Sequence, residues 1–165
     1  MQVFITVGTT SFDELIRALD SISFYNKCVE IGFNNVIFQI GNSTVVPDQC
    51  HVPKCIKMSW FRFQSSLHDI LEKSDLVITA GGAGTISESL KLNKRVIVAI
   101  NRTLLHNHQM ELASKYQDLN HLAVVDTPHL VPSRLDYVMN HTFTPLQEPE
   151  PDVLLRHLKS RFFDV

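Results

Sequence analysis

The sequence predicts an α/β fold in which helices cover both faces of a doubly wound, mostly parallel sheet. Short β-branched apolar runs alternate with longer amphipathic stretches along the chain, which is the pattern of repeated strand–helix units. Most of the runs are apolar at consecutive positions, as in strands buried between two helical layers. The chain has 165 residues, of which 44% are hydrophobic and 19% charged, so a single globular domain of this kind is long enough to bury a core.

The predicted elements follow one another in regular order. Strands are expected where the apolar runs lie, at residues 3–7, 35–40, 56–60, 75–79, 95–100 and 122–125. Helices are expected in the amphipathic stretches between them, at residues 11–19 with more helix towards 31, then at 64–73, 85–92, 106–116 and 131–139. Residues 41–54 contain two prolines and Cys50 and are expected to form a long loop. Crossovers between parallel strands should be right-handed.

The C-terminal part differs from the rest in composition. Residues 145–151 hold three of the seven prolines, which predicts a linker. We therefore expect a domain over residues 1–144, this linker, and an amphipathic helix over residues 152–165. The helix would either dock on a partner or fold back onto its own domain. Its apolar stripe is formed by Leu154, Leu155, Leu158 and Phe162.

Charge and cysteine content exclude several classes of protein. Fifteen Lys and Arg residues against 17 Asp and Glu residues leave a net charge of −2, which argues against nucleic-acid binding and against a polybasic membrane surface. The three cysteines are odd in number and scattered, so no disulfide framework is expected. The first residues lack a basic signal-type region, and no apolar run approaches the ~20 residues of a membrane span. We expect a reduced, cytoplasmic protein with no direct membrane span.

The strongest local signal is a glycine-rich turn between a predicted strand and a helix. It consists of Gly81, Gly82, Ala83, Gly84 and Thr85, and glycine at such a turn leaves the first N–H groups of the helix open to a phosphate. Glu88, one turn later, could reach a ribose hydroxyl pair. The alternative is a tight turn whose glycines serve packing alone. The spacing is neither G-x-G-x-x-G nor G-K-[ST], which disfavours a dinucleotide site and a P-loop.

Two further polar segments follow predicted strands. Gly8, Thr9 and Thr10 come directly after the first strand, where ligands of open parallel sheets bind, and could hold a pyrophosphate. The alternative is an ordinary helix N-cap formed by Thr10 or Ser11.

Asn107, His108 and Gln109 stand at a later helix start, following the strand predicted at residues 95–100. Their side chains are suited to hydrogen-bonding sugar hydroxyls, and solvated helix-start residues are the alternative. His106 and His108 diverge on a helix, the cysteines lack zinc-site spacing, and no D-x-D occurs. We therefore expect neither a metal nor a cofactor.

Together, in order and spacing, the three motifs resemble one family. It is the cytosolic catalytic subunit of the UDP-N-acetylglucosamine transferase that adds the second sugar to the dolichol-linked oligosaccharide. That family is similar to the Rossmann-like, nucleotide-sugar-binding C-terminal half of GT-B glycosyltransferases. The resemblance implies that the glycine turn holds the diphosphate and Glu88 the ribose. It also implies that residues 8–10 face the pyrophosphate and the acceptor, and that residues 107–109 face the N-acetylglucosamine.

The resemblance also implies the reaction and the partners. Transfer from UDP-N-acetylglucosamine to dolichol-linked N-acetylglucosamine diphosphate would invert the anomeric centre. The chain offers one of the two lobes of a GT-B enzyme and no evident catalytic base. A membrane-anchored, acceptor-binding subunit at the cytosolic face of the endoplasmic reticulum would therefore complete the cleft. The family often has histidine where this chain has Ala80. A non-catalytic nucleotide-sugar-binding module is the alternative function, and the size disfavours a two-lobed UDP-sugar epimerase.

Overall fold

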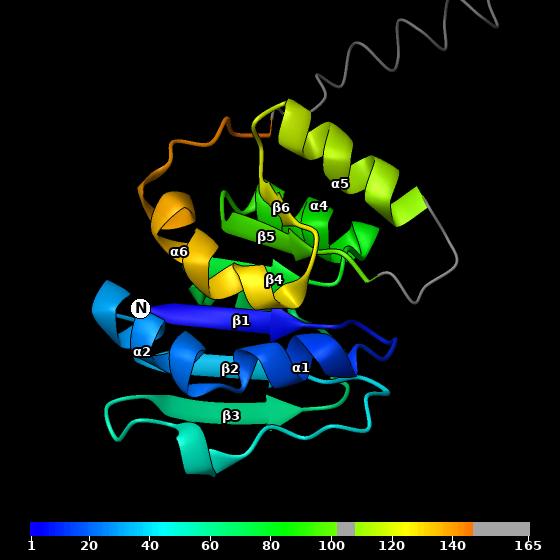
Figure 1. The fold of residues 1–165 in the computed structure, drawn as a ribbon. Coiled ribbons are helices and arrows are strands. Elements are labelled where there is room, and N and C mark those ends of the chain that lie inside the picture. The colour runs from blue at the N-terminus through cyan, green and yellow to red at the C-terminus, as the bar shows by residue number, and fades with distance from the viewer. Residues whose placement is uncertain (102–107, 147–165) are drawn as a thin grey trace, which may run out of the picture.

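A parallel sheet of six strands forms the centre of the computed structural model, which describes residues 1–101 and 108–146 (Figure 1). Its strand order in this part of the chain is β3-β2-β1-β4-β5-β6, and every neighbouring pair is parallel. This confirms the predicted doubly wound sheet. The strands are β1 (Gln2–Thr6), β2 (Asn35–Gln39), β3 (Lys57–Phe61), β4 (Leu76–Thr79), β5 (Arg95–Ala99) and β6 (Ala123–Val125).

Helices cover both faces of this sheet. One apolar core lies under α1, α2 and α6, which stand in front of the strands in Figure 1, and a second core lies under α3, α4 and α5. The first set is α1 (Asp13–Leu19), α2 (Ile22–Ile31) and α6 (Val131–Asn140). The second is α3 (His68–Lys73), α4 (Ala83–Lys91) and α5 (His108–Asp118). Two short 3-10 helices complete the elements of the described residues, η1 (Gln49–His51) and η2 (Pro128–Leu130).

Strand β1 shows why the predicted strands are apolar at consecutive positions. Val3 and Ile5 belong to the core under α1, α2 and α6, whereas Phe4 between them belongs to the opposite core. All three side chains are fully buried. Each contributes about 1.5–3 kcal/mol by leaving water, so a polar residue at any of them would be costly. The two-sided burial fixes β1 in the middle of the sheet.

Some helix boundaries differ from the predicted ones, and two of these differences lie near the site described below. The helix expected from residue 64 begins at His68, and residues 64–67 form a loop instead. The helix expected from Thr85 begins two residues earlier, at Ala83, with Gly82 as its N-cap. The predicted loop over residues 41–54 is present and contains η1.

The described part of the chain ends just inside the predicted linker. Leu146 packs against the core under α3, α4 and α5. The rest of the linker and the helix predicted over residues 152–165 lie outside the described residues. Among the described helices none is long and apolar enough to cross a lipid bilayer.

Candidate functional site

The site lies where the strand order changes direction. The chain leaves β1 towards β2 on one side and leaves β4 towards β5 on the other, so the loops after β1 and β4 diverge at the carboxyl edge of the sheet. In doubly wound sheets ligands bind in the crevice at this switch point. A cleft of about 430 Å³ occupies it here. Its lining includes Gly8, Thr9 and Thr10 from the first loop and Gly82, Gly84 and Thr85 from the glycine turn.

The glycine turn presents an uncapped helix start to this cleft. Gly81 has a φ of 96°, a backbone conformation that is strained for residues with a side chain. Gly82 is the N-cap of α4 and makes no side-chain cap bond. A Cβ built on Gly84 would meet no atom within 4 Å. Packing against the protein therefore does not require glycine at residue 84. The open N–H groups and the positive end of the α4 dipole suit an anion.

The first loop is shaped by its own backbone and does not cap a helix. Gly8 has a φ of 66°, and its N–H donates to Thr6 Oγ1 at 2.9 Å. Thr10 Oγ1 donates to the Val7 carbonyl at 2.8 Å. Helix α1 begins at Asp13 with Phe12 as N-cap and no side-chain cap bond. The alternative in which Thr10 or Ser11 caps this helix is therefore wrong.

Gly41 and Asn42, just after β2, contact the first loop and hold it in place. Gly41 approaches so closely that a Cβ there would lie 2.5 Å from the Gly8 carbonyl oxygen and 2.6 Å from that of Thr10. Asn42 donates its backbone N–H to the Thr10 carbonyl at 3.0 Å and its Nδ2 to the Thr9 carbonyl at 2.8 Å. The shape of the first loop thus depends on a segment about thirty residues away in the chain.

Two groups of cleft residues are missing from the sequence interpretation. Gln39 is buried at the end of β2, where its Oε1 accepts from Thr6 Oγ1 at 2.6 Å, and it lines the cleft. An amide at the carboxyl end of a strand with an apolar middle is the available signal. The loop at residues 64–67 lines the opposite wall. Its polar run follows a strand, as the loops after β1 and β4 do, but the sequence predicts the start of a helix there.

Glu88 stands beside the cleft. It lies three residues after Thr85, on the same face of α4. Its Oε1 is 3.1 Å from Nδ1 of His68 at the start of α3, and the two side chains are 43% and 54% exposed. The sequence predicts a ribose near Glu88 but assigns no role in the site to His68. The structure places the His68 imidazole in contact with the Glu88 carboxylate.

The third predicted motif is only partly described. Asn107 lies outside the described residues. His108 and Gln109 begin α5, which follows β5, but their side chains are outside the description as well. The structure therefore brings the first two motifs together, and the role of the third stays a prediction.

The described residues that line the cleft carry no charged side chain. Its lining consists of glycine, alanine, valine, leucine, threonine, serine and glutamine, so within the described chain no carboxylate or imidazole faces it. Nor do the described residues bring three or more His, Cys, Asp or Glu side chains together in a way that could hold a metal ion. Hydroxyls, amides and backbone N–H groups are what the cleft offers. Such a lining can bind a polar ligand with one anionic part lying at the start of α4.

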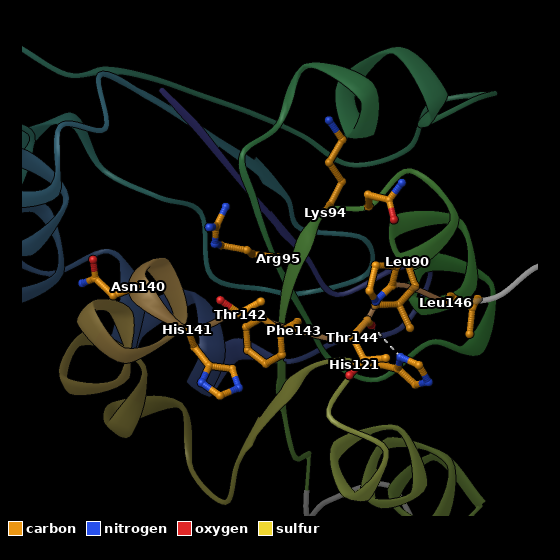
Figure 2. A pocket seen from close by; sticks show the side chains of 12 residues that line it. Leu90, Lys94, Arg95, His121, Asn140, His141, Thr142, Phe143, Thr144 and Leu146 are labelled. Carbon is orange, nitrogen blue, oxygen red and sulfur yellow. Dashed lines mark hydrogen bonds between the residues drawn. The ribbon is translucent and has the colours of Figure 1, made fainter.

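A second hollow, of about 250 Å³, lies at the opposite edge of the sheet, but its polar groups do not converge (Figure 2). Arg95 Nε donates to the Val138 carbonyl at 3.2 Å, and His121 Nδ1 donates to the Thr144 carbonyl at 2.7 Å. Lys94 Nζ donates to a carbonyl of α3. In Figure 2 these three side chains point in different directions. These three polar side chains therefore bond to the backbone of the chain and do not form a common binding site.

The fold and its cleft define a Rossmann-like α/β domain with its site at the switch point. Residues 2–154 match the glycosyltransferase family 28 C-terminal domain, and the chain belongs to this family. The fold is that of the C-terminal half of GT-B glycosyltransferases. Acinetobacter baumannii MurG shares it with a TM-score of 0.64 at 18% identity, over 84% of this chain and 41% of that one.

Relatives with higher identity carry one name. The human UDP-N-acetylglucosamine transferase subunit ALG13 is 41% identical over 120 residues, which are 73% of this chain and 10% of that protein. The Saccharomyces cerevisiae protein of the same name is 29% identical over 151 residues, covering 73% of this chain and 75% of the yeast protein. An NMR solution structure of ALG13 matches with a TM-score of 0.68 at 25% identity, over 95% and 94% of the two chains. The family resemblance found in the sequence is thus confirmed. The chain spans about a tenth of its human and mouse relatives.

Proposed function

We propose that this chain is the donor-binding part of a UDP-N-acetylglucosamine transferase and that the cleft between the β1 and β4 loops holds the donor. One observation carries the proposal: the two glycine-containing loops line the same cleft at the switch point, and the uncapped start of α4 is open to this cleft at Gly84. The names of the human and yeast relatives support UDP-N-acetylglucosamine as the donor.

The position of the α4 N-terminus supports one orientation of the donor in the cleft. The diphosphate is the only anionic part of the donor, and it belongs at the glycine turn, residues 81–85, with residues 8–10 on its other side. Glu88 then accepts from the ribose hydroxyls, and residues 107–109 face the sugar. As the glycosidic bond breaks, negative charge grows on the departing diphosphate. Fixed N–H groups already aimed at that position stabilise the charge without a metal.

The acceptor side requires a partner. Inverting transfer to dolichol-linked N-acetylglucosamine diphosphate needs a base on the acceptor hydroxyl, and the described cleft lining contains no carboxylate or imidazole. We assign the base and the acceptor site to a membrane-anchored subunit at the cytosolic face of the endoplasmic reticulum. Within this proposal residues 1–144 form the donor domain, residues 145–151 the linker, and residues 152–165 the helix that docks on that subunit.

Calorimetry on the purified chain tests donor binding. UDP and UDP-N-acetylglucosamine should bind and GDP-mannose should not. A chain that binds none of the uridine nucleotides would contradict the proposal.

Transfer assays then separate the transferase from a binding module without catalysis. The chain alone should transfer nothing, and the chain with its membrane subunit should extend the acceptor by one sugar. Deleting residues 152–165 should abolish co-purification of the two subunits. Activity of the single chain would remove the need for a partner, whereas donor binding without transfer by the assembled pair would favour the binding module.

A further inference from the structure

One polar contact joins two walls of the cleft. His68 Nδ1 and Glu88 Oε1 are 3.1 Å apart, and they belong to α3 and α4 respectively. A carboxylate oxygen can only accept, so the proton of this hydrogen bond is assigned to Nδ1. The bond fixes the position of Glu88 relative to a helix other than its own.

Both partners are tied to residues that line the cleft. His68 directly follows the loop at residues 64–67, and its backbone N–H donates to Ser66 Oγ at 3.2 Å. Glu88 stands one helical turn beyond Thr85. The pair therefore sits at the rim of the cleft, with one member supported by each wall.

The contact leaves half of the carboxylate available. Within the described chain the His68 imidazole is the sole partner of the Glu88 side chain, and the bond occupies Oε1 alone. Oε2 can accept from a ligand hydroxyl. A glutamate has three rotatable bonds, and ordering such a half-exposed side chain on binding lowers affinity. Holding it beforehand removes part of that loss.

We propose that His68 is a positioning residue that holds the Glu88 carboxylate ready to accept hydrogen bonds from the ribose of a uridine nucleotide. The inference rests on the proposed function, because it needs a uridine nucleotide in the cleft. It assigns to His68 a share in selecting ribose over deoxyribose, although His68 itself does not touch the ligand.

Calorimetric titration of UDP and 2′-deoxy-UDP tests this role. His68→Ala should weaken UDP binding about three- to tenfold and change 2′-deoxy-UDP binding much less, so that the preference for the ribonucleotide falls. His68→Asn should restore most of that preference, because Asn Nδ2 can replace the Nδ1 donor. His51→Ala is the matched control, since His51 is exposed on η1 and does not line the cleft.

The outcomes separate the two proposals. If the native chain binds no UDP, the proposed function fails and the positioning role fails with it. If UDP binds but His68→Ala weakens both nucleotides equally, or neither, the positioning role alone is overturned. A second test compares UDP affinity of the Glu88→Ala variant with that of the Glu88→Ala, His68→Ala double variant, so that it does not rest on the single His68→Ala variant alone. Adding His68→Ala in that background should change UDP affinity no further, and an additional loss would contradict the proposal.

Discussion

Replacing Gly84 by alanine should stabilise the fold and weaken donor binding at the same time. Gly84 lies inside α4, and a Cβ there meets nothing within 4 Å, so the methyl group costs no contact. Alanine in a helix is favoured over glycine by about 0.5–1 kcal/mol. For a chain of this size that corresponds to a melting temperature about 1–4 °C higher.

The same substitution adds a methyl group to a residue of the cleft wall. Gly84 lines it, and a diphosphate held by the first N–H groups of α4 must approach this backbone closely. Losing one charge-assisted hydrogen bond costs about 1.5–3 kcal/mol, or a factor of about 10 to 150 in the dissociation constant of UDP. Gly84→Val, which is bulkier, should lose at least as much.

Thermal unfolding and calorimetry on the same samples measure both effects. Ser87→Ala on the same helix is the control, because it also raises helix propensity but lies outside the cleft lining. It should be at least as stable as the native chain and bind UDP unchanged. If Gly84→Ala bound UDP with native affinity, the placement of the diphosphate would be refuted. If this variant were less stable than the native chain, the conclusion that a Cβ fits freely at residue 84 would be refuted.

Three further perturbations probe other parts of the molecule. Gln109→Ala should weaken UDP-N-acetylglucosamine binding and leave UDP binding unchanged in calorimetry, whereas equal losses would show that Gln109 acts on α5 and not on the sugar. Gly41→Ala should lower the unfolding free energy by about 2 kcal/mol or more, measured in urea, because its φ of 49° is strained and its Cβ would overlap two carbonyl oxygens of the first loop. The hydroxyl of Thr44 donates to Asp13 and holds the pKa of that carboxyl below its usual value. Because the folded-state pKa is lowered, the stability from this contact is present above the unfolded value of ~3.9 and is lost as pH falls through the folded value. Thr44→Val should therefore be less stable than the native chain at pH 7, and the two urea unfolding curves should converge in acid.

The sequence predicts the strands and helices of this fold better than it predicts which of them lie side by side. Runs such as Val3–Ile5 predict buried strands because both of their faces are apolar. Clustered glycines predict the turn at Gly81–Gly84. Which loops meet depends on the strand order, and this order is decided by packing between strands far apart in the chain. The sequence alone does not contain the adjacency of β1 and β4 that makes one cleft from two motifs.

The missed parts of the site share a physical cause. Gln39 is polar and buried because Thr6 on the neighbouring strand satisfies it, which no local pattern reveals. Residues 64–67 have the polarity of a helix start, but the helix begins only at His68. Gly41 is needed for the close approach of a loop that lies outside its own segment. In each case the reason for the residue lies on another strand or loop.

The bracing of the first loop by Gly41 and Asn42 has a consequence for the order of folding. The contacts that shape residues 8–10 span about thirty residues, so they can form only after β2 has paired with β1 across the intervening helices. Recovery of UDP binding during refolding should therefore lag behind helix formation and report when this first crossover closes. A peptide ending before Gly41 would contain every residue of the first loop and its local hydrogen bonds, but it would lack the Gly41 and Asn42 contacts that hold the loop in place.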